Sequence, residues 1–281
     1  MSLFFYRLKR SSSVLSLFFF SALVTQAQSL PTPLSNLSSY QMVFHDEFDT
    51  LDLSPNGAGS FNWYAGVWFN HRQTPLANIS VSNSILTLQW TAGQPSTDTS
   101  ITTLSRDKTR YHAWRYGYFE ARLRWDVVTG AWPAFWMIPV QDAIGTDIYS
   151  GQKESGEIDI FEGQGDQPNT FFATIHDWVN LKDSANLNNV VKLSPSVNMS
   201  QFHTYGVLWI PGQMTWYLDG TPIHSEMAPP IFDKQDFFVV LGMQEGANWK
   251  AGNMTGVSAT SMKMDVDWFR VWQNQPIPAG Q

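Results

Sequence analysis

Apolar and polar residues alternate along several short stretches of this chain, and a period of two is typical of a β-strand with one buried face. Two clear runs are Ile85–Trp90 and Tyr116–Trp125. No window of about a dozen residues has the 3.6-residue period of an amphipathic helix. The pattern therefore predicts an all-β protein.

Further strand-like runs extend this prediction. They are Phe171–His176, Tyr205–Ile210, Met214–Leu218, Phe237–Met243 and Met264–Trp272. Pro211–Gly212 separates two of these runs as a hairpin turn would, and Asp219–Gly220 supplies a favoured two-residue turn after the second. Many short strands joined by turns form a sandwich or a barrel. We expect a two-sheet antiparallel β-sandwich of the jelly-roll type.

The first 27 residues have the order of a secretory signal peptide. Three basic residues in Met1–Arg10 precede the apolar run Val14–Val24, and small residues follow within Thr25–Ala27. The apolar run is about half of the roughly 20 residues that a membrane-spanning helix needs. We therefore expect residues 1–27 to be removed. Residues 28–281 then form one secreted domain, extracellular or periplasmic, of 281 − 27 = 254 residues.

The charge of the mature chain excludes two classes of partner. Without the three basic residues of the leader, the formal net charge is (17 − 3) − 24 = −10. Nucleic acids and anionic membranes need a basic surface, so we expect neither as a partner.

The chain has no cysteine, so its core alone must stabilise it. We expect a monomer.

Three acids lie within six residues of one apolar strand: Glu157, Asp159 and Glu162. In a regular strand Glu157 and Asp159 share one face, whereas Glu162 points to the other face, into the core. An unpaired buried carboxylate is costly. One extra residue, a β-bulge near Ile160–Phe161, would return Glu162 to the face of Glu157. We therefore expect a bulge.

Two glutamates on one face fit the hydrolysis of a glycosidic bond. Retaining glycosidases use two carboxyl groups about 5–5.5 Å apart, one ionised as the nucleophile and one protonated as the general acid. Asp159 between them would couple the two titrations. The alternative interpretation is an acidic strand at a solvent-exposed edge, which the apolar neighbours of the three acids disfavour.

The motif Glu157-x-Asp159-x-x-Glu162 resembles the catalytic strand of glycoside hydrolase family 16. The resemblance continues through the chain in the order of that family, over about residues 42–273. The other matching segments are Val43–Phe48, Tyr116–Arg122, Trp132–Pro139, Phe202–Tyr205, Trp216–Gly220 and Val266–Val271. The resemblance implies a concanavalin-like jelly roll and a secreted glycosidase with a double-displacement, retaining mechanism.

The resemblance also implies roles for individual residues. Glu157 would be the nucleophile, Glu162 the acid/base and Asp159 the helper. Trp132 and Trp136 would form a platform for sugar rings, because an indole face stacks on the apolar face of a pyranose. Core packing is the alternative role for both tryptophans.

Weaker candidates complete the predicted site. They are the cleft residues His176, Asn70, Arg115 and Trp178. The family often carries a structural calcium, for which Asp267 is the matching ligand, although a hard cation needs six or more oxygens. Catalysis itself would need no cofactor.

Three functions remain open at this stage. The first is endo-hydrolysis of a β-1,3-glucan, a β-1,3/1,4-glucan or a bacterial exopolysaccharide. A transglycosylase would use the same site and pass the glycosyl group to another sugar. A non-catalytic, lectin-like module would need the fold and the aromatic residues but not the three acids, so the intact Glu157, Asp159 and Glu162 set disfavours it.

Overall fold

The protein is a two-layered β-sandwich in a computed structural model that describes residues 30–66, 74–140, 154–179, 182–183, 190–193, 197–247 and 250–274. The predicted leader, residues 1–27, lies outside the described residues. Three helical elements are described in full, and each is a 3₁₀ turn of three residues: Thr32–Leu34, Leu76–Asn78 and Phe232–Lys234. In the described part of the chain, no helix is both long and apolar enough to cross a membrane.

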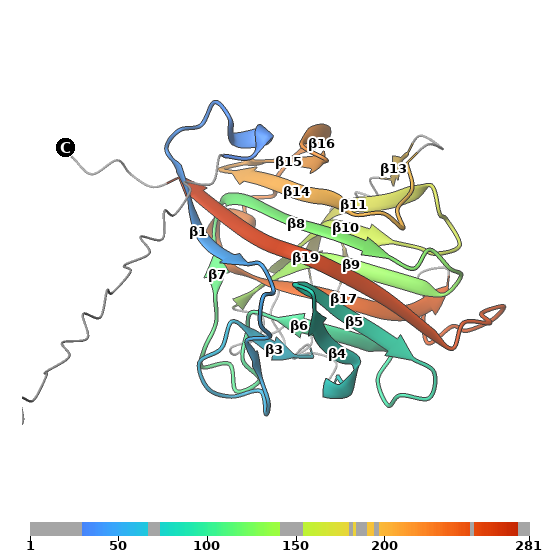
Figure 1. Ribbon diagram of the computed structural model, residues 1–281. Coiled ribbons are helices and arrows are strands. Elements are labelled where there is room, and N and C mark those ends of the chain that lie inside the picture. Colours follow the sequence, from blue (N-terminus) through green and yellow to red (C-terminus); the bar gives the residue numbers. More distant parts are fainter. Residues whose placement is uncertain are drawn as a thin grey trace, which may run out of the picture.

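The first layer is an eight-stranded sheet. Its strands follow the order β16-β15-β14-β8-β19-β5-β4, and β1 pairs with β19. Figure 1 shows this sheet in front, with the long β19 crossing it. The bounds are β16 Thr221–Met227, β15 Gln213–Leu218, β14 His203–Ile210, β8 Gly117–Trp125, β19 Ser261–Asn274, β5 Ile85–Thr91, β4 Ile79–Ser82 and β1 Tyr40–Asp46.

The second layer is an eleven-stranded sheet with the order β12-β11-β10-β9-β17-β6-β3-β2, to which β7, β13 and β18 add short pairings. Its central strands are β11 Thr170–Val179, β10 Glu154–Gly163, β9 Ala131–Pro139, β17 Phe237–Ala247 and β6 Asp98–Thr102. The remaining strands are β12 Lys182–Asp183, β3 Trp63–Ala65, β2 Leu53–Ser54, β7 Ala113–Trp114, β13 Val190–Lys192 and β18 Lys250–Ala251. The expected two-sheet sandwich is confirmed.

Aromatic side chains from both sheets fill the space between the layers. The ring of Phe161 on β10 lies 4.3 Å from that of Tyr205 on β14, and Phe135 on β9 packs edge-on against Phe269 on β19. All four side chains are fully buried. Burial of such a side chain contributes roughly 1.5–3 kcal/mol relative to its exposure. The core therefore fixes the position of β10 relative to the opposite sheet.

Turn residues set the ends of several strands. β14 and β15 pair as a hairpin around Pro211–Gly212, as expected. Asp219 and Gly220 both have positive φ, 49° and 73°, as a two-residue turn between β15 and β16 requires. The strand expected from Tyr116 begins one residue later. Tyr116 has φ 62°, and a Cβ at Gly117 would lie 2.6 Å from the Trp272 carbonyl oxygen.

Candidate active site

A β-bulge interrupts β10 between Asp159 and Glu162. On the β11 side, Asp159 is opposite Thr174 and Glu162 is opposite Phe172, so three steps on β10 match two on β11. On the β9 side the same shift lies between Asp159 and Phe161. One extra residue at this place is the irregularity that the spacing of the acids predicts.

The bulge places the three acids on the face opposite the core. Ile158, Ile160 and Phe161 are at most 1% exposed and belong to the core between the sheets. Because Ile160 and Phe161 are consecutive and both buried in that core, the alternation shifts by one residue at this point. Glu157, Asp159 and Glu162 therefore share the outer face of the eleven-stranded sheet, as the sequence predicts.

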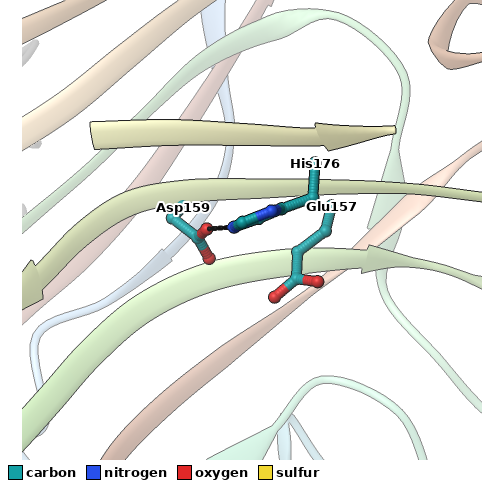
Figure 2. A group of neighbouring side chains, drawn as sticks. All are labelled: Glu157, Asp159 and His176. Carbon is teal, nitrogen blue, oxygen red and sulfur yellow. Dashed lines mark ion pairs between the residues drawn. The ribbon is translucent and has the colours of Figure 1, made fainter. Parts of the chain in front are cut away.

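Asp159 and His176 form the centre of the acidic group. His176 lies directly opposite Glu157 on the neighbouring strand β11. Its Nε2 is 3.0 Å from Asp159 Oδ2, an ion-pair distance when the imidazole is protonated. Figure 2 shows both side chains beside Glu157. The ligand-type atoms of the three residues all lie within 4.8 Å of one another.

Glu162 is held by an indole and surrounded by negative charge. Trp132 Nε1 donates a 2.9 Å hydrogen bond to Glu162 Oε1. Burial raises the pKa of Glu162 well above its ordinary value of 4.5, and the charges of Asp159 and Glu157 raise it further. The hydrogen bond from Trp132 and the nearby His176 act in the opposite direction. This environment therefore favours the protonated form of the Glu162 carboxyl group.

Trp132 and Trp136 lie on the same face as the acids. Along β9 the residues Pro133, Phe135 and Met137 are buried, whereas Trp132, Ala134 and Trp136 are partly exposed. Trp136 is opposite Asp159, and Ala134 is opposite Glu162. Trp136 also packs on an apolar cluster of Leu104, Ile138, Val140, Phe238 and Val240. The two indoles thus flank the strand position that faces Glu162.

A tryptophan from the opposite sheet holds the bulge from behind. Trp216 on β15 is fully buried, and its Nε1 donates a 3.0 Å hydrogen bond to the backbone carbonyl of Asp159. The register of β10 shifts directly after Asp159, and a buried carbonyl needs a hydrogen-bond partner, which this indole supplies. No sequence pattern indicates this contact. A buried indole N–H signals that a partner exists, but not which one.

Other predicted cleft residues lie elsewhere or outside the described part. The Arg115 guanidinium bonds to the backbone carbonyls of Asp233 and Gln235 and to the carboxylate of Asp236, so it ties down the segment before β17. Asn70 and the side chain of Trp178 lie outside the described residues. Their roles, and a role for Arg115 in the cleft, stay predictions.

Asp267 lies on β19 of the eight-stranded sheet, not on the sheet that holds the acids. Its carboxylate forms an ion pair with Arg122, whose guanidinium also covers the ring of Phe202. Ca²⁺ binds six to eight oxygens. In the part of the chain that the structure describes, Asp267 belongs to no group of three or more acidic or histidine side chains. A calcium-binding role for Asp267 stays a prediction.

Comparisons with known proteins agree with this geometry. The model of the family described as glycosyl hydrolases family 16 matches residues 67–270. The chain is 28% identical to an endo-1,3-1,4-beta-glycanase of Rhizobium meliloti over 82% of its length and 51% of the relative's. It is 24% identical to a beta-glucanase of Rhodothermus marinus, covering 83% of this chain and 85% of that one.

A solved structure shows the same fold. The laminarinase catalytic domain of Thermotoga maritima superposes with a TM-score of 0.67 at 23% identity, over 84% of this chain and 99% of that one. Several of the curated relatives are longer proteins, and the chain spans about half of their length.

Proposed function

Because this chain belongs to glycoside hydrolase family 16, we propose that it is a secreted, retaining endo-glycosidase that hydrolyses β-glycosidic bonds in a neutral glucan. The observation that carries this proposal is the bulge in β10, which brings Glu157, Asp159 and Glu162 to one face beside two tryptophans. A lectin-like module binds sugars without catalytic carboxylates, so it does not need a bulge that turns Glu162 to the face of Glu157.

The first step forms a covalent intermediate. The Glu157 carboxylate attacks the anomeric carbon while Glu162 donates its proton to the leaving glycosidic oxygen, so the C–O bond of the glycoside breaks as the ester to Glu157 forms. The raised pKa of Glu162 supports this assignment, because the general acid must carry a proton before cleavage.

The second step releases the sugar. Glu162, now ionised, takes a proton from water, and the resulting hydroxide equivalent attacks the anomeric carbon and displaces Glu157. Two inversions give net retention of the β configuration. Asp159 and His176 flank Glu157 and form an ion pair with each other at 3.0 Å. A sugar acceptor in place of water would make the protein a transglycosylase.

The charge of the sheet supports a neutral substrate. The five central strands β11, β10, β9, β17 and β6 contain no lysine or arginine. Recognition of sulfate esters needs cationic side chains. Relatives named as an endo-1,3-1,4-beta-glycanase, a glucan endo-1,3-beta-glucosidase and a beta-glucanase point to β-1,3- or mixed β-1,3/1,4-glucans as the neutral polymers.

A panel of polysaccharides tests the proposal. Laminarin, lichenan, xyloglucan, agarose, bacterial exopolysaccharides and a sulfated carrageenan are incubated with the protein, and reducing ends and viscosity are followed together. We expect release from laminarin or lichenan, with viscosity falling well before much reducing sugar appears. Activity on carrageenan alone would contradict a neutral substrate. Steady release of one mono- or disaccharide would contradict endo action, and product sizes above the starting length would identify transglycosylation.

A further inference from the structure

Glu157, Asp159 and His176 bring one imidazole and two carboxylates together on adjacent strands. Glu157 and His176 form a cross-strand pair between β10 and β11, and Asp159 lies two residues further along β10 on the same face. Asp159 is only 2% exposed. In the described part of the chain its Oδ2 has no hydrogen-bond partner, although this oxygen lies 3.0 Å from His176 Nε2.

The spacing of the donor atoms suits a small tetrahedral metal ion. Zinc binds imidazole nitrogen and carboxylate oxygen at about 2.0–2.2 Å, which places neighbouring donors about 3.3 Å apart in a tetrahedron. His176 Nε2 and Asp159 Oδ2 are already 3.0 Å apart, and the third donor, from Glu157, lies within 4.8 Å of both. Glu157 is partly exposed, so an ion can reach this set from solvent.

The donor types select the class of metal. Ca²⁺ and Mg²⁺ prefer sites made of oxygen alone, whereas an imidazole with carboxylates suits Zn²⁺ and its neighbours in the first transition row. Three protein donors leave the fourth position of the ion open. The negative field of Glu157 and Asp159, which also acts on Glu162, attracts a divalent cation to this point.

We propose that Glu157, Asp159 and His176 bind one Zn²⁺ ion, and that this ion inhibits the protein. Coordination neutralises the Glu157 carboxylate and occupies the space through which an anomeric carbon reaches it. The binding site follows from the geometry alone, whereas the inhibition rests on the proposed hydrolase function.

Titration calorimetry with ZnCl₂ tests the binding directly. The protein is first freed of metals and then studied in a buffer that does not chelate zinc. We expect one ion per chain, with MgCl₂ giving no comparable heat. In parallel, glucan hydrolysis should be inhibited by ZnCl₂ competitively with the polysaccharide and restored by EDTA.

Two matched histidine variants locate the site. His176→Gln should weaken zinc binding by about tenfold or more. Mutation of a residue that only hydrogen-bonds to a metal ligand already lowers the metal affinity by about 10–100-fold, and His176 would be a ligand itself. His224 offers a control, because its Nε2 is also paired with a carboxylate, Glu226 Oε2 at 3.1 Å, but belongs to no described group of three donors. His224→Gln should keep the affinity of the unchanged protein.

The outcomes separate the two proposals. Absence of stoichiometric zinc binding, or equal affinities of His176→Gln and the unchanged protein, would overturn the metal site whatever the activity. Zinc binding that depends on His176 in a protein without glycosidase activity would keep the site and overturn the proposed function. Tight binding with unchanged hydrolysis rates would overturn the inhibition.

Discussion

The indole Nε1 of Trp216 donates a 3.0 Å hydrogen bond to the backbone carbonyl of Asp159, across the core and from the opposite sheet. Asp159 is the last residue of β10 before the bulge, and Glu162 is the first acid after it. The bond therefore fixes the point at which the strand changes register. The relative position of Glu157 and Glu162 depends on that point.

Trp216→Phe should lower turnover more than it lowers substrate affinity. The change leaves a buried carbonyl without its donor, at a cost of about 1–3 kcal/mol, and loosens the bulge. Because a misplacement of about 1 Å can cost 10²-fold, we expect kcat to fall by tenfold to a hundredfold with a smaller change in KM. Steady-state kinetics and a thermal melt measure both effects.

Trp209→Phe is the control for this change. Trp209 lies on β14 of the same sheet and is also fully buried, but its Nε1 has no hydrogen-bond partner in the part of the chain that the structure describes. Its replacement should leave kcat nearly unchanged. Equal losses of kcat in the two variants would show that Trp216 acts by packing alone.

Glu162→Gln should stabilise the fold at neutral pH and not at acid pH. The unfolded chain releases the Glu162 proton near the ordinary pKa of 4.5, whereas the folded chain keeps it to higher pH. At pH values between the unfolded and the folded pKa of Glu162, the folded state binds more protons than the unfolded state. The free energy of unfolding therefore falls as the pH rises through this range. The glutamine amide of Glu162→Gln does not titrate, so the variant does not lose stability in this way.

Thermal melts of both proteins from pH 4 to pH 8 measure the effect. The Tm of Glu162→Gln should exceed that of the unchanged protein increasingly as the pH rises, and the two should converge toward pH 4. Glu226→Gln on β16, outside the acidic group, should show no such gain. A constant difference at all pH values would contradict the buried, proton-retaining Glu162.

Removal of Ca²⁺ should leave the stability of the fold unchanged. Arg122 already pairs with Asp267, and among the described residues Asp267 belongs to no group of three or more acidic or histidine side chains. We expect the same Tm with EDTA and with added CaCl₂. A rise in Tm with CaCl₂ that Asp267→Asn abolishes would instead establish the calcium site that the family resemblance implies.

The product released first should have the β configuration. Attack by Glu157 and then by water inverts the anomeric carbon twice. Proton NMR of the nascent reducing end, recorded before mutarotation equilibrates the anomers, distinguishes the two cases. An initially α product would require a single displacement by water and would exclude Glu157 as the nucleophile.

The sequence predicts the sandwich and the bulge for clear physical reasons. Period-two runs indicate which strands exist, and turn residues indicate where hairpins close. The bulge is predictable because Glu162 lies three positions after Asp159, and with this odd spacing a regular strand would bury the second carboxylate. Both predictions concern residues that are close along the chain.

Contacts between distant segments could not be predicted in the same way. The bond from Trp216 to Asp159 joins residues 57 positions apart on opposite sheets, and no local pattern specifies it. The pairing of Arg122 with Asp267 spans 145 positions and changes the environment of a residue that looks like a metal ligand in the sequence. Such contacts depend on the register of both sheets.

Covalent trapping of the nucleophile tests the central claim most directly. An activated β-linked 2-deoxy-2-fluoro glucan oligosaccharide should form the ester and then turn over slowly, because the fluorine disfavours the oxocarbenium-like transition state of both steps. Peptide mass spectrometry should then find one glycosyl adduct on Glu157, and Glu157→Gln should remain unlabelled. An adduct on Asp159 or Glu162, or full activity without any adduct, would contradict the assignment of Glu157 and Glu162 as nucleophile and acid/base.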